Sequence, residues 1–196
     1  IQIFGYEQFE FEAGGYRFLG CNCGPDMRMA PALVPRSSME WIQGLKPGKP
    51  VIFLNHYPLN DGMSNWFEIR RELIRLDCRM TICGHGHRNK TYDYAGLPGM
   101  MGRTSLRGKK MAGYNILTIE NGQFRAAERV VNEEGGQTKD PWYTKELLPV
   151  TDTTKYDADG LPLDYKLFPF SRNSEYPQVK ARRARTEDAN IGFGFA

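Results

Sequence analysis

One stretch in the middle of the chain reads as a strand, a helix and a second strand, and this order constrains the fold more than any other feature. The strands are predicted over Pro50–Leu54 and Arg79–Cys83, both runs of buried-type residues. Asn65 can cap a helix between them, along which apolar residues recur at helical spacing: Trp66, Ile69, Leu73 and Leu76. Such a crossover is right-handed and returns the second strand parallel to the first.

All three histidines of the chain lie at the ends of this unit. His56 follows the first strand, and His85 and His87 follow the second. Parallel strands bring their carboxyl ends to one edge of the sheet, where ligands bind in open α/β folds. In an extended segment His85 and His87 point the same way, and Gly84 and Gly86 permit close approach and strained backbone angles. We therefore expect three imidazoles to meet, and imidazole suits Zn, Fe, Mn and Ni.

Short elements are predicted on both sides of this unit. Phe9–Glu12 and Tyr16–Cys21 flank two glycines and indicate a hairpin. Ser37 and Glu40 form a capping box at the start of a short amphipathic helix. Four strands are expected later, with Asn121-Gly122 forming a type I′ turn between the last two: Lys90–Tyr94, Leu97–Met101, Tyr114–Glu120 and Gln123–Val131. The class is therefore α/β (α+β).

The chain changes character after residue 131. Residues 132–196 are rich in Asp, Thr, Pro and Gly, and only weak strands and extended loops are predicted there. We expect a first unit over 1–131 and a loop-rich extension or incomplete second domain over 132–196. The four cysteines do not have zinc-ribbon spacing and are expected to be buried and unpaired.

Composition excludes several classes of protein. A bilayer span needs about 20 consecutive apolar residues, and none is present. The net charge of +3 is far from the basic stripe of a nucleic-acid-binding protein, so no specific nucleic-acid binding is expected.

Two motifs carry the histidines: Phe53-Leu54-Asn55-His56-Tyr57-Pro58 and Ile82-Cys83-Gly84-His85-Gly86-His87. They resemble the last two motifs of the calcineurin-like metallophosphoesterases, in which one strand ends in His shortly before Pro and a later strand ends in Gly-His-x-His. The resemblance covers roughly residues 1–131 and is specific in the two histidine motifs. It implies half of that family's β-sandwich, flanked by helices.

The earlier motifs of the family are absent from the chain: Asp-x-His, Gly-Asp-x-x-Asp and Gly-Asn-His-Glu/Asp. The pair Asn55-His56 does not replace the last of these, because no Gly precedes it and Tyr57 stands where an acid is required. The chain thus resembles the second half of a catalytic domain that begins upstream of Ile1. That upstream half is the partner the resemblance implies, and this chain alone is expected to be inactive.

The resemblance also implies roles for individual residues. His56 and His85 would bind one of two divalent ions (Mn, Fe, Zn, Ni or Mg), and His87 the other. The bridging Asp and the general acid would lie upstream, and the reaction would be hydrolysis of a phosphomonoester or phosphodiester. Residues that could contact the phosphate ester follow the histidines: Asn55, Tyr57, Asp61 and Asn89.

Two other functions remain open from the sequence. One is a non-catalytic binding module that keeps the fold, and the other is a domain of different fold that binds one metal ion through three histidines. The large tail slightly favours a periplasmic or secreted protein over a cytoplasmic one.

Overall fold

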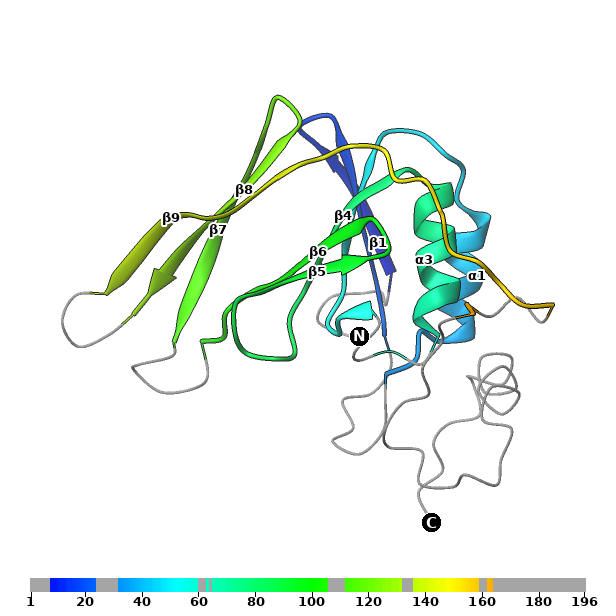
Figure 1. The fold of residues 1–196 in the computed structure, drawn as a ribbon, viewed down its shortest axis with the longest axis horizontal. Coiled ribbons are helices and arrows are strands. Elements are labelled where there is room, and N and C mark those ends of the chain that lie inside the picture. Colours follow the sequence, from blue (N-terminus) through cyan, green and yellow to red (C-terminus); the bar gives the residue numbers. More distant parts are fainter. Residues whose placement is uncertain are drawn as a thin grey trace, which may run out of the picture.

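The computed structural model describes residues 8–23, 32–59, 63, 65–105, 112–131, 136–158 and 162–163. A six-stranded sheet in the order β1-β2-β3-β4-β6-β5 lies at the centre, with two helices on one face and a three-stranded sheet, β7-β8-β9, on the other (Figure 1). This arrangement confirms the mixed α/β class. The elements are β1 Gln8–Ala13, β2 Tyr16–Cys21, α1 Arg36–Gly44, β3 Val51–Leu54, α3 Trp66–Arg75, β4 Cys78–Cys83, β5 Lys90–Tyr94, β6 Leu97–Met101, β7 Gly113–Glu120, β8 Gln123–Val130 and β9 Gln137–Glu146.

The predicted strand–helix–strand unit forms the middle of the large sheet. Strands β3 and β4 are parallel neighbours, and α3 connects them. Both faces of β3 are buried, because Val51 and Phe53 pack on the helix side while Ile52 packs toward the small sheet. A strand buried on both faces reads as a continuous apolar run, which is why this strand was readable from the sequence.

The predicted hairpins are also present. Gly14 and Gly15 turn the chain between β1 and β2 with φ of 55° and 84°. Asn121 and Gly122 have φ of 48° and 76° between β7 and β8, as a type I′ turn requires.

The helix starts differ from the prediction. Helix α1 begins at Arg36 after Pro35, and no side chain caps it, so the capping box was wrong. The carboxylate of Glu40 instead accepts a hydrogen bond from Arg36 at 2.8 Å. Asn65 does precede α3, but its amide bonds the backbone N–H and C=O of Val34 rather than its own helix.

Beyond residue 131, the described residues contain a longer strand than the sequence predicted. Strand β9 has ten residues and pairs antiparallel with β8, where the sequence indicated only weak strands. The chain then crosses back to the helix layer as the yellow segment of Figure 1. We call residues 147–156 the return segment. Arg79 holds its start by donating to the carbonyl of Leu147 at 2.9 Å. Neither described helix is long and apolar enough to cross a bilayer.

Candidate functional site

The rings of His56 and His85 meet at the carboxyl ends of β3 and β4. Their centroids are 5.4 Å apart, the ring planes lie at 81°, and both residues are exposed. The backbone keeps these strand ends together, because Asn55 N–H donates to Ile82 at 3.1 Å and Gly84 N–H donates to His56 at 2.9 Å. The parallel crossover therefore brings these two imidazoles together, as the sequence predicted for them.

The backbone between residues 84 and 87 differs from the expected extended segment. His85 and His87 have φ of 70° and 58°, in the left-handed region, while neither glycine of the motif has a positive φ. The strain expected at the glycines thus falls on the two histidines. A Cβ at Gly86 would lie 2.5 Å from the Sδ atom of Met101, so a larger residue there would displace the end of that side chain. Non-glycine residues held in this region cluster at functional sites, which supports a role for the loop.

Tyr57 is 3% exposed and packs beneath the two histidines. Its ring centroid lies 4.3 Å from that of His85 and 4.9 Å from that of His56. Asn55 Nδ2 donates a hydrogen bond to the backbone carbonyl of Tyr57 and so ties the turn around His56. The Oδ1 atom of Asn55 is buried and finds no hydrogen-bond partner among the described residues.

The remaining predicted site residues are His87, Asn89 and Asp61. His87 is half-buried. Asn89 buries both polar atoms of its amide without a partner in the described part of the chain. Asp61 lies outside the described residues. Within the described ranges, no three His, Cys, Asp or Glu side chains are grouped closely enough to hold a metal ion.

The distance expected between two imidazole ligands tests whether a metal ion fits between His56 and His85. Two imidazoles that bind one tetrahedral zinc ion, at Zn–N distances of about 2.0–2.1 Å, have ring centres roughly 5 Å apart. The separation of 5.4 Å between His56 and His85 suits two ligands of one ion, although rings also pack edge to face without a metal. The described residues thus fit part of a coordination sphere and do not complete it.

The cysteines do not extend this donor set. None of the four forms a disulfide bond, in line with the prediction, and Cys23, Cys78 and Cys83 are buried while Cys21 is half-buried. Burial raises the pKa of the Cys78 thiol to about 12. Because the thiolate is the form that binds metals and attacks substrates, Cys78 is a structural residue.

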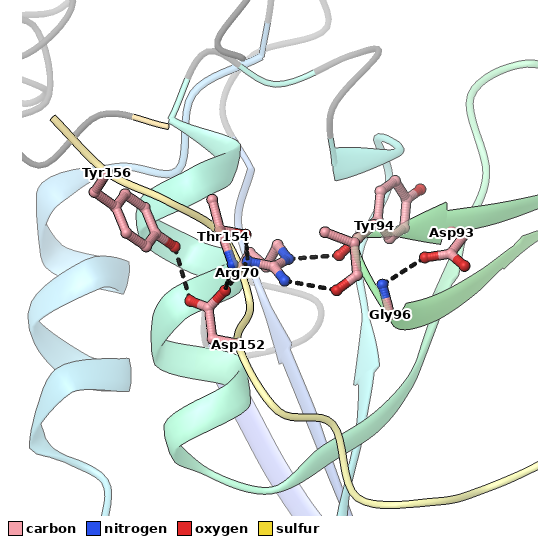
Figure 2. A network of polar contacts seen from close by, with 8 residues as sticks. Arg70, Asp93, Tyr94, Gly96, Asp152, Thr154 and Tyr156 are labelled. Atoms are coloured by element: carbon pink, nitrogen blue, oxygen red, sulfur yellow. Dashed lines mark hydrogen bonds and ion pairs between the residues drawn. The ribbon is translucent and has the colours of Figure 1, made fainter. Parts of the chain in front are cut away.

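Sequence reasoning missed a second polar cluster, which surrounds Arg70 (Figure 2). The spacing of apolar residues placed Arg70 among the polar positions of its helix, yet its side chain is fully buried. It donates to the backbone carbonyls of Tyr94 and Ala95 and pairs with Asp152 and Thr154 of the return segment. Helical spacing does place residue 70 on the inner face, four residues after Trp66 and three before Leu73, but its partners are far away in the sequence and have no local signal.

No protein-family model matches the chain, and no curated protein sequence matches it. Several solved structures overlap part of the fold. Vps29 from Entamoeba histolytica, in complex with zinc, is 11% identical with a TM-score of 0.35, over 68% of this chain and 58% of that protein. GAP50 from Plasmodium is 10% identical with a TM-score of 0.43, over 74% of this chain and 54% of that protein.

A protein from Streptococcus pneumoniae described as a predicted phosphoesterase is 10% identical with a TM-score of 0.34, over 70% of this chain and 64% of that protein. The chain therefore spans less than two thirds of the length of each of these three proteins. The overlap is partial and says nothing about activity.

Proposed function

We propose that this chain is the back half of a metal-dependent phosphoesterase domain. The observation that carries the proposal is the convergence of His56 and His85, whose rings lie 5.4 Å apart at the ends of neighbouring parallel strands. Ligand sites in open α/β sheets lie at this edge. The sequences that end the two strands support the proposal, since they resemble the last two motifs of the calcineurin-like family.

In this proposal His56 and His85 hold one divalent ion through their imidazole nitrogens, and His87 serves a second ion. Bound there, the ions would act as Lewis acids on a phosphoryl oxygen and lower the pKa of a water molecule. The amide of Asn89, whose polar atoms have no partner among the described residues, and the carboxylate of Asp61 are the proposed contacts for the phosphate ester. The remaining ligands, the bridging Asp and the general acid come from an upstream half of the same domain.

The first test is the sequence that precedes Ile1 in the gene. The proposal requires Asp-x-His and Gly-Asp-x-x-Asp in that order, because three imidazoles without carboxylates cannot hold two ions about 3.5–4 Å apart. An upstream sequence without these motifs would overturn the proposal.

The second test is made on the longer protein, purified with Mn²⁺ or Zn²⁺. Metal content is measured by mass spectrometry, and hydrolysis is measured with p-nitrophenyl phosphate and bis-p-nitrophenyl phosphate. Loss of a ligand is expected to exceed the roughly 10–100-fold effect of losing an outer-shell partner, so His56→Ala and His85→Ala should each lower kcat/KM by at least about 100-fold. Both variants should also lower the metal content.

Gln123→Ala is a control, because Gln123 is exposed in the β7–β8 hairpin and belongs to the small sheet. It should leave metal content and turnover unchanged. One ion bound without the upstream half would favour a mononuclear three-histidine site. Absence of metal from the longer protein would favour a binding module without catalysis.

A further inference from the structure

The position of Tyr57 in the site differs from that of the histidine beside it. His56 is exposed, while its neighbour Tyr57 is only 3% exposed. The Tyr57 ring joins the core cluster between the large sheet and the helices, together with Phe53 and Leu59.

This buried ring contacts both imidazoles of the site. The three ring centroids form a triangle with sides of 4.3 Å from Tyr57 to His85, 4.9 Å from Tyr57 to His56, and 5.4 Å between the histidines. The contact with His56 follows from adjacency in the sequence. The contact with His85 joins the ends of two different strands.

The backbone around Tyr57 is held on both sides. Asn55 Nδ2 donates to the carbonyl of Tyr57, and the backbone N–H of Leu59 donates to the hydroxyl of Tyr94 at 3.3 Å. The Tyr57 ring therefore rests on a turn that is itself fixed to the core.

His85, in contrast, needs support from outside its own segment. Its φ of 70° lies in a region that non-glycine residues occupy only when surrounding contacts hold them there. The face of the Tyr57 ring, tilted by 38° to the imidazole of His85, is such a contact.

We propose that Tyr57 is a positioning residue that sets the separation and orientation of His56 and His85 for a shared divalent cation. The inference rests on the proposed function for the identity of the ligand. Its geometric part, the support of His85 by the Tyr57 ring, stands independently of any metal.

The test uses Tyr57→Phe, which keeps the ring, and Tyr57→Leu, which removes it. Zn²⁺ binding to each variant of the longer protein, which includes the proposed upstream half, is measured by isothermal titration calorimetry. Groups that orient metal ligands typically contribute 10–100-fold to affinity, so Tyr57→Leu should weaken Zn²⁺ binding by about 10–100-fold. Tyr57→Phe should stay within about threefold of the original chain, because the packing surface of the ring is unchanged.

A second readout needs no metal. The chain has only three histidines, so their imidazole signals can be assigned in NMR spectra from single His→Ala variants. In the metal-free chain, His85 should show nuclear Overhauser contacts to the Tyr57 ring, and Tyr57→Leu should shift the His85 signals. Phe124→Leu is the matched control, because it removes a fully buried ring from the other core cluster and should leave both histidines and Zn²⁺ affinity unchanged.

The outcomes separate this inference from the proposed function. Zn²⁺ affinity and His85 signals that are unchanged in Tyr57→Leu would overturn the positioning role. A wild-type longer protein that binds no Zn²⁺ would count against the metal pair, and the His85 signals would then decide the role of Tyr57 alone. If Tyr57→Leu does not fold, the original protein and Tyr57→Phe decide the outcome. Absence of the Tyr57–His85 contacts in the original chain would overturn the inference. Their presence, together with unchanged Zn²⁺ binding in Tyr57→Phe, would support it.

Discussion

The guanidinium of Arg70 pairs with the carboxylate of Asp152 at 2.9 Å, although 82 positions separate them in the sequence. The side chain of Arg70 is fully buried, and a buried charge persists only when partners satisfy it. Two backbone carbonyls of the β5–β6 turn and the hydroxyl of Thr154 accept its other hydrogen bonds (Figure 2). The return segment is thereby fastened to helix α3 and to the sheet.

Replacing Arg70 by Ala should lower the free energy of unfolding by about 3–5 kcal/mol, the usual cost of breaking a buried ion pair. The substitution leaves the two carbonyls without their donor and Asp152 without its ion-pair partner. Urea denaturation followed by circular dichroism measures the change. Arg71→Ala on the same helix is the control, because Arg71 is half exposed, and it should stay within about 0.5 kcal/mol. Equal costs for the two variants would show that the return segment is not held by Arg70.

The same pair predicts a loss of stability in acid. Burial raises the pKa of Asp152, but hydrogen bonds from Arg70, Thr154 and Tyr156 outweigh it and lower the pKa from its ordinary 3.8 to about 2. A carboxyl group with a depressed pKa stabilises the fold above its unfolded pKa, and this contribution is lost as the pH falls between about 4 and 2.

The variant Asp152→Asn tests this dependence, because it cannot titrate. Thermal unfolding measured from pH 6 to pH 2 should show a smaller loss of stability in Asp152→Asn than in the original chain. The difference should arise between about pH 4 and pH 2. Parallel curves for the two proteins in this interval would contradict the prediction.

His85 should be strained in the folded chain. Its φ of 70° costs an L-residue about 1–2 kcal/mol, whereas glycine adopts such angles without penalty. We expect His85→Gly to be about 1 kcal/mol more stable than His85→Ala in thermal unfolding, and both variants lack the imidazole that is proposed as a metal ligand. At His56, which is not among the positive-φ residues, Gly should be no more stable than Ala. A His85→Gly variant no more stable than His85→Ala would remove the argument from strain.

The sequence predicted the elements whose formation is decided locally. Strands β3 and β4 have both faces buried and read as apolar runs, and Asn121-Gly122 has the turn chemistry of its hairpin. The crossover rule then placed His56 and His85 at one edge. These predictions needed only the residue composition, the spacing of apolar residues and the right-handedness of the crossover connection.

The parts that the sequence did not predict depend on distant contacts. Strand β9 contains Pro141 and several charges, and it pairs with β8 without an apolar pattern of its own. Arg70 is buried because Asp152 reaches it from the return segment. The left-handed angles of His85 and His87 have no local signal, since the neighbouring glycines were the expected place for them.

Strand β7 is expected to make the isolated chain self-associate. It is an edge strand of the small sheet, and Tyr114, Ile116 and Leu117 are 54%, 45% and 38% exposed. Before its last residue it carries neither the charges nor the proline that commonly block pairing at sheet edges. Ile116→Lys places a charge on this edge and should lower the apparent mass at high concentration, measured by light scattering after gel filtration. Gln123→Lys adds the same charge to the exposed surface of β8 and should not lower it. A chain that is monomeric at every concentration, or equal effects of the two lysines, would contradict the prediction.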